Sequence, residues 1–209
     1  MTDVVRALRE RARDAFRNGH FDEADSLSRE AANAGLAAAE RARRIQQQAE
    51  QAATEPALDA AEDIATRGEV ALTRLDYHGA AAQFAEAASV VPATQSEARD
   101  RLLLRQAAAL HDAGEMRGDP ADLRRAVTLL QDVLPRRPRG ARPEDWADLQ
   151  NRLGIVLRVI GERGDDAALR RAVATYEAAL DVFRGLDVPA YLALVDRNLM
   201  RARALLAAR

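Results

Sequence analysis

Three histidines are the side chains of this chain best suited to acid–base catalysis or metal binding near neutral pH. His20 and His78 fall in turns between expected helices, and His111 falls within a helix. None of them has a second histidine or a pair of carboxylates at the sequence spacing of a metal site. The chain contains no cysteine, which excludes thiolate catalysis and cysteine–zinc sites. We therefore expect no catalytic, cofactor-binding or metal-binding residues.

Two pairs of adjacent carboxylates, Asp22-Glu23 and Asp165-Asp166, have the composition of a general acid–base dyad. Each pair falls in the first turn of an expected helix, where negative charge offsets the helix dipole. A structural role is therefore favoured for both. All 31 basic residues are arginine, and the lack of lysine removes Schiff-base chemistry and the lysine of a phosphate-binding P-loop. These absences predict a protein that is not an enzyme.

Four arginines lie in the longest irregular segment that we expect, the Pro- and Gly-rich residues 135–143. Guanidinium groups can hold phosphates or carboxylates in a bidentate manner. No aromatic residues alternate with these arginines to stack on bases, and the formal net charge of the whole chain is −2. A solvated loop is therefore favoured over a contact with nucleic acid or an acidic partner. The arginines of this loop are Arg136, Arg137, Arg139 and Arg142.

The elements that position these side chains are expected to be helices. Hydrophobic residues, mainly Ala, Leu and Val, make up 48% of the 209 residues, and aromatic residues only 4%. Ala and Leu have high helix propensity, whereas the β-branched and aromatic runs typical of strands are scarce. Glu55-Pro56 predicts the end of a long second helix. The remaining Gly, Pro and Asp residues predict about nine helices. The first ends at about residue 17, and the others run over about 21–53, 57–75, 79–90, 95–115, 120–134, 143–161, 165–184 and 188–208.

Membrane and export signals are not evident in the sequence. No apolar run approaches the ~20 residues that a membrane-spanning helix needs. The first residues lack the apolar core of a signal peptide. We therefore expect a cytoplasmic protein with no membrane partner.

Two segments of the chain are nearly identical. Residues 117–127 and 163–173 agree at nine of eleven positions and lie 46 residues apart. Each contains Arg-Gly-Asp, in which the glycine is placed to end one helix and the aspartate to begin the next. Self-similarity at such a period is typical of repeat proteins, in which each unit buries its apolar face against its neighbours.

Residues 61–94 carry a more specific pattern. Gly68 is followed by Ala80, Phe84, Ala87 and Pro92 in the order G-x11-A-x3-F-x2-A-x4-P. This pattern resembles the tetratricopeptide repeat (TPR), a 34-residue helix–turn–helix unit. The family's early Trp and Tyr are replaced here by Ile64 and Ala71.

The later units keep the same order of small and large residues with a longer turn. Leu153-Gly154 precedes Ala172, Tyr176 and Ala179, and the unit before it has Ala126, Leu130 and Val133. Units of about 46 residues resemble extended TPR arrays common in bacterial proteins. The resemblance implies an all-α, right-handed α-solenoid of antiparallel hairpins. Its parts would be a divergent hairpin over 1–55, repeats over 57–92, 95–134 and 143–184, and a capping helix over 188–208.

The resemblance also implies a binding surface. In TPR arrays the first helix of each hairpin lines a concave groove that holds a peptide or protein. We expect the single Trp146 to pack within its hairpin, because Leu149 and Leu153 follow it at helical spacing. The positions in this sequence that match the groove are Arg6, Arg9, Arg13, Glu62, Glu69, Arg105, Asp112, Asp148, Asn151, Arg152 and Arg158.

These features predict an adaptor or scaffold that binds a peptide or protein partner and has no cofactor. The alternative is a regulatory or sensor unit that controls an associated effector, with nucleic acid contacted through the Arg136–Arg142 loop. A homo-oligomer formed through the N-terminal hairpin is also considered. Its long Ala/Arg/Gln-rich helix includes Ile45 among few large apolar residues, so a partner could stabilise it.

Overall fold

The computed structural model describes residues 3–209 and is helical throughout its regular elements. This range contains eight α-helices and one 3-10 helix. No helix within it is both long and apolar enough to cross a membrane. Contacts within the chain divide it into two compact units, with the boundary between Pro56 and Ala57. The helices are α1 (Asp3–Arg17), α2 (Phe21–Thr73), α3 (Tyr77–Val90), α4 (Ser96–Arg117), α5 (Pro120–Val133), η1 (Leu134–Arg136), α6 (Pro143–Glu162), α7 (Asp166–Leu186) and α8 (Pro189–Ala207).

The first unit is a hairpin of α1 and the N-terminal part of α2. Apolar residues of α1 recur at the three- and four-residue spacing of one helix face and are buried against Ala24, Leu27 and Ala31 of α2. Gly19 closes the turn with a φ of 77°, a left-handed conformation that glycine adopts without a steric penalty. The core of this hairpin is small. Its α1 residues include Leu8, Ala12 and Ala15.

The predicted helix end at Glu55-Pro56 is wrong. Helix α2 continues through Pro56 to Thr73, so residues 3–209 contain eight α-helices where the sequence predicted about nine. Proline lacks the N–H that would bond to the carbonyl of Ala52, and its ring crowds that carbonyl. Both residues are exposed, so water can satisfy the carbonyl. The Ala, Gln and Glu residues on either side favour helix strongly enough to continue it.

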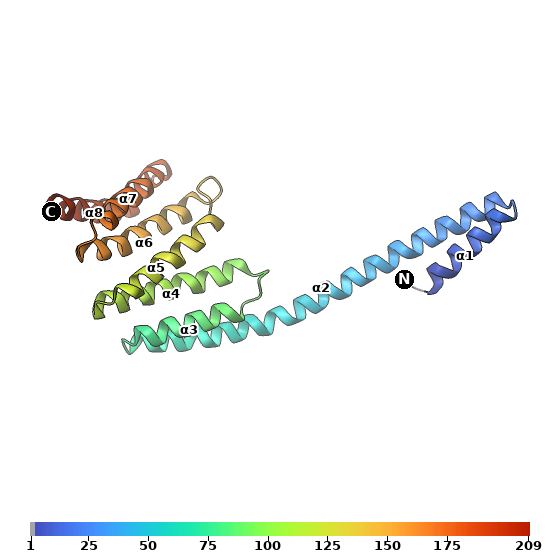
Figure 1. Cartoon of the computed structure of the whole chain (residues 1–209), viewed down its shortest axis with the longest axis horizontal. Coiled ribbons are helices and arrows are strands. Elements are labelled where there is room, and N and C mark those ends of the chain that lie inside the picture. The colour runs from blue at the N-terminus through green and yellow to red at the C-terminus, as the bar shows by residue number, and fades with distance from the viewer. Residues whose placement is uncertain (1–2) are drawn as a thin grey trace. The chain divides into compact units, whose positions relative to one another are not determined.

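The second unit begins with the last turns of α2 and continues through α3 to α8. Consecutive helices pack against one another, and Figure 1 shows α3 to α8 following in chain order from green to red. Its core centres on the fully buried rings of Phe84, Tyr176 and Phe183. Small residues bring the helices close together. A Cβ on Gly68 would lie 2.7 Å from Phe84, and one on Gly154 would lie 2.6 Å from Tyr176.

The duplicated segments form equivalent turns, as predicted. Gly118 and Gly164 have φ values of 78° and 110° and follow α4 and α6. Asp119 then accepts a hydrogen bond from the amide of Ala121 at 2.7 Å, and Asp165 accepts one from Ala168 at 2.9 Å. These bonds cap the N-termini of α5 and α7. The Arg-Gly-Asp tripeptides are therefore helix–turn–helix junctions.

The arginine of the second duplicated segment also links one hairpin to the hairpin before it. Arg163 donates hydrogen bonds to the carbonyl oxygens of Gly114 at 2.6 Å and Glu115 at 3.3 Å, near the C-terminus of α4. Arg209, 46 residues later, donates in the same way to the carbonyl of Gly161 at the end of α6. Cationic donors suit these positions because the last carbonyls of a helix carry partial negative charge, and the carbonyls of Gly114 and Gly161 accept a second hydrogen bond besides their backbone one.

Candidate functional site

Polar contacts join the even-numbered helices of the second unit into one surface. Arg105 of α4 forms an ion pair with Glu69 of α2 at 2.6 Å. Asn198 of α8 donates a hydrogen bond to Asn151 of α6 at 3.0 Å. Helices α4 and α6 are joined through Arg163, described above. We call this surface the even-helix face. It consists of the polar residues that make or flank these contacts on α4, α6, α8 and the part of α2 after Ala57.

Arg105 is held on this face by two interactions. Besides its pair with Glu69, its guanidinium lies 5.1 Å from the ring centroid of Phe84, within the range of a cation–π contact. Glu62 lines the same depression as Arg105 between α2 and α4, with a volume of about 500 Å³. The structure thus brings together three of the predicted groove positions, Glu62, Glu69 and Arg105.

On α6, the predicted positions divide into exposed and buried side chains. Arg152 donates to Asp148 at 2.7 Å across one helical turn, and its side chain is about half exposed. Asn151 and Arg158 are buried. Asn151 is used by its bond to Asn198, so it is not available to a ligand without breaking that bond. Arg152 and Asp148 are the accessible members of the set.

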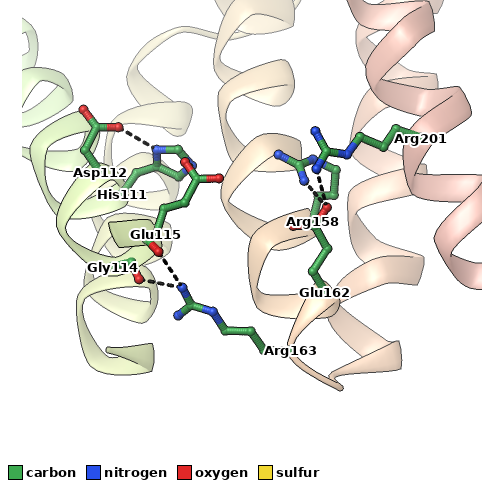
Figure 2. Close-up of polar contacts among 8 residues, drawn as sticks. All are labelled: His111, Asp112, Gly114, Glu115, Arg158, Glu162, Arg163 and Arg201. Carbon is green, nitrogen blue, oxygen red and sulfur yellow. Dashed lines mark hydrogen bonds and ion pairs between the residues drawn. The ribbon is translucent and has the colours of Figure 1, made fainter. Parts of the chain in front are cut away.

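The buried Arg158 belongs to a charge cluster that extends to the surface. Figure 2 shows Glu162 between Arg158 of the same helix and Arg201 of α8. The Glu162–Arg201 distance is 3.1 Å. A buried guanidinium requires such pairing, because removing it from water otherwise costs several kcal/mol (roughly). The cluster fixes α8 against α6.

The hydroxyl of Tyr176 lies in the interior close to this cluster. It is buried and makes no hydrogen bond within residues 3–209. Burial raises the pKa of Tyr176 to about 12, and the nearby Arg158 lowers it in part, through its charge and through its approach to the hydroxyl outside hydrogen-bond geometry. The phenol is therefore held in its neutral form and has no acid–base role near pH 7.

His111 provides a polar atom in a small pocket between α4 and α6. The pocket has a volume of about 190 Å³, and its walls include Leu104, Ala108 and Ile155. Nδ1 of His111 lies 3.0 Å from a carboxylate oxygen of Asp112, as drawn in Figure 2, so in the neutral ring the proton belongs on Nδ1. Nε2 is then an acceptor. It is buried, makes no hydrogen bond in the described part of the chain, and lies 4.0 Å from a carboxylate oxygen of Glu115.

The four arginines of the 135–143 loop are all paired with carboxylates of the chain itself. Arg136 binds the buried Asp100 at 2.7 Å, Arg137 binds Asp145 at 3.2 Å, Arg139 binds Asp181, and Arg142 binds Glu97. The hydrogen bond from Arg142 also lowers the pKa of Glu97. A phosphate at this loop would have to compete with four carboxylates for these arginines. Trp146 packs on the core, as predicted, beneath the guanidinium of Arg139 at 5.4 Å.

The remaining predicted residues lie elsewhere. Arg6 pairs with Asp3 at 2.5 Å on the surface of α1, whereas Arg9 and Arg13 line a groove of the N-terminal hairpin. His20 lies in the turn between α1 and α2, 3.8 Å from Glu23.

Sequence reasoning missed the role of His78. Its Nε2 lies 2.7 Å from the buried carboxylate of Asp122 on α5, and Arg117 contacts its Nδ1 at 3.1 Å. Helices α3 and α5 are thereby joined in the same way that the even-numbered helices are. Asp122 is the second carboxyl residue after Arg117-Gly118, and only the fold brings it to His78.

No protein-family model matches this chain, and no curated protein is significantly similar to it.

Proposed function

We propose that this protein is an interaction module, an adaptor or scaffold without enzymatic activity, that binds a peptide or protein on the even-helix face. The observation that carries the proposal is the chain of contacts from α2 to α4, α6 and α8 through Glu69–Arg105, Arg163–Gly114 and Asn151–Asn198. Side-by-side first helices of successive hairpins are what a TPR-type, right-handed solenoid would present to a partner. The resemblance of Gly68, Phe84 and the later units to that bacterial family supports this, and with it a cytoplasmic location.

The chemistry of the face favours a partner of mixed charge. Arg105, Asp112 and Arg152 are partly exposed along α4 and α6, so opposite charges alternate over a short distance. The pocket beside His111 could receive an apolar side chain that also donates one hydrogen bond to Nε2. The contacts of the buried Asn151 and Arg158 fix the helices before binding, which reduces the entropy lost on association.

The test uses peptides selected from a random displayed library on the immobilised full chain. Their affinities are compared for the wild type and for Arg105→Gln combined with Arg152→Gln. We expect a loss of at least about tenfold, equal to about 1.4 kcal/mol, since two charged contacts are removed.

A matched control changes Arg124→Gln and Arg170→Gln. These exposed arginines occupy the same position of the two duplicated segments on α5 and α7 and lose the same charge. The proposal is refuted if the control pair weakens binding and the even-helix pair does not, or if no selected peptide distinguishes the two variants.

A further inference from the structure

A groove within the first unit lies along the hairpin of α1 and α2. Its volume is about 690 Å³, and it is lined by Arg9, Arg13, Phe16 and Arg17 of α1 and by Phe21 and Ala31 of α2, among others. On α1 these residues lie beside the face that is buried against α2. The groove is therefore an open side of the hairpin that neither helix covers.

The end of the groove next to the turn is apolar and exposed. The side chains of Phe16 and Phe21 are 64% and 63% accessible, and their rings meet edge to face with centroids 5.6 Å apart. Two large aromatic residues left in water on a small hairpin are unusual, because burying each one would stabilise a contact by about 1.5–3 kcal/mol. Ala24, Ser28 and Ala31 continue the groove floor along α2 with small side chains. A helix could therefore approach the floor closely.

The rim of the groove is basic. Arg9, Arg13 and Arg17 are spaced by four residues, so their side chains form one row along α1. Arg17 has a weak pair with Asp14 at 3.4 Å, and the one carboxylate of the lining, Asp25, is already paired with Arg29 at 2.5 Å. The lining thus contains three arginines and one carboxylate, and that carboxylate is paired with Arg29 outside the groove.

We propose that this groove binds an acidic amphipathic helix of a partner protein. The apolar residues of that helix would cover Phe16 and Phe21, and its Glu or Asp residues would face the arginine row. Helix-in-groove recognition uses apolar anchors at i, i+3 or i+4 and i+7, which match a floor formed by two antiparallel helices. The site is separate from the even-helix face.

A second copy of the chain fits this groove less well. A symmetric pair of hairpins meeting through their grooves would place each arginine row against its own image. Like charges facing each other across an interface oppose association. Charge complementarity therefore selects an acidic partner over self-association through this face.

The test measures the binding of two fluorescein-labelled helical peptides to the full chain by fluorescence anisotropy at low and at physiological salt. Each peptide has about 18 residues, or five turns, with leucines at i, i+3, i+7 and i+11. One carries glutamates beside the leucines and the other carries lysines at the same positions. We expect the acidic peptide to bind at least about tenfold more tightly than the basic one, with an affinity that falls as salt rises.

Two variants assign the binding to the groove. Arg9→Glu with Arg13→Glu should weaken the binding of the acidic peptide by at least about tenfold and strengthen the binding of the basic peptide. The matched control, Arg11→Glu with Arg41→Glu, makes the same charge change at exposed positions outside the groove and should bind like the wild type. Far-UV circular dichroism of each variant checks that helix content is retained. Phe16→Ala, which keeps every charge, gives a second measurement and should also weaken the acidic peptide.

Three results overturn the proposal. The first is equal binding of both peptides, or no binding of the acidic peptide at low salt. The second is a loss of binding in the control variant as large as in the groove variant. The third is a dimer in analytical ultracentrifugation that Arg9→Glu with Arg13→Glu dissociates and the acidic peptide does not displace, since a second copy would then be the occupant.

Discussion

Replacing Tyr176 by phenylalanine tests the packing at the centre of the second unit. The ring fills the space above Gly154, and its hydroxyl is buried without a hydrogen bond inside the described chain. In the first repeat-like unit Phe84 packs on Gly68 with the same neighbours in sequence, Ala80 and Ala87, so a phenylalanine is already accommodated in equivalent surroundings. Tyr176→Phe should therefore fold with unchanged helix content.

The expected change in stability has two parts. At pH 7, removing a buried hydroxyl that makes no hydrogen bond should raise the free energy of unfolding by about 1 kcal/mol, the lower end of the cost of such a group. The second part depends on pH. The pKa of Tyr176 rises from 10 unfolded to about 12 folded, so the folded state retains a proton that the unfolded state releases. The contribution of this proton to the free energy of unfolding is complete below pH 10 and is lost as the pH rises through 12. The full loss for a difference of two pKa units is about 2.7 kcal/mol.

The assay is urea denaturation followed by far-UV circular dichroism at pH 7, 10 and 12, for the wild type and Tyr176→Phe. Differences between the two proteins cancel the titration of the other tyrosines. The advantage of the variant should widen from about 1 kcal/mol at pH 7 to between about 3 and 4 kcal/mol at pH 12. The argument from burial would be refuted if both proteins lost the same free energy of unfolding above pH 10. A variant less stable than the wild type at pH 7 would also refute it.

Two further predictions concern packing and charge. Gly154→Ala places a Cβ 2.6 Å from an aromatic ring and should lower the free energy of unfolding by about 1–3 kcal/mol. Gly35→Ala, whose Cβ would have no atom within 4 Å, should raise the free energy of unfolding by about 0.5–1 kcal/mol. Thermal unfolding of the two variants measures both changes, and equal effects would contradict the close packing at Gly154. Glu97→Gln should lower the melting temperature above pH 4.5, because the hydrogen bond from Arg142 lowers the pKa of Glu97 and stabilises the fold only while the carboxylate is charged. The difference from the wild type should vanish as the pH falls through the lowered pKa, and a difference that grows in acid would have the wrong sign.

The sequence was most informative where local physical rules act alone. The helix ends at Gly118 and Gly164 and the caps at Asp119 and Asp165 follow from residue type and position, and the structure confirms them. At Pro56 a local rule was outweighed. One missing hydrogen bond, exposed to water, did not end a helix that its neighbours favour.

The candidate site was harder to predict, because it depends on contacts between distant residues. The pattern placed Glu69 and Arg105 among the positions of the predicted groove but did not predict the ion pair that they form. It did not reveal that Arg158 would be buried against Glu162, nor that each arginine of the 135–143 loop would find a carboxylate 3 to 45 residues away. From the sequence, arginines in a loop predict either a solvated surface or a binding site for a partner. Only the folded structure shows which carboxylates of the same chain pair with them.

The hydrogen bonds from Arg163 and Arg209 couple the end of α6 to α4 and the residues after α8 to α6. Each guanidinium completes the C-terminal turn of the preceding even-numbered helix, so that turn depends on a residue 48 or 49 positions further along the chain. Local opening should therefore propagate in one direction. When α8 opens, the carbonyl of Gly161 at the end of α6 loses its side-chain donor and keeps only backbone donors, while opening of α4 removes no donor from α6. In a nearest-neighbour description of a repeat protein, each contact between adjacent units stabilises both of them. Here the donor always lies in the later unit and the acceptor in the earlier one, so the coupling has a direction. Amide hydrogen exchange should follow it, with the final turn of α6 losing protection whenever α8 does.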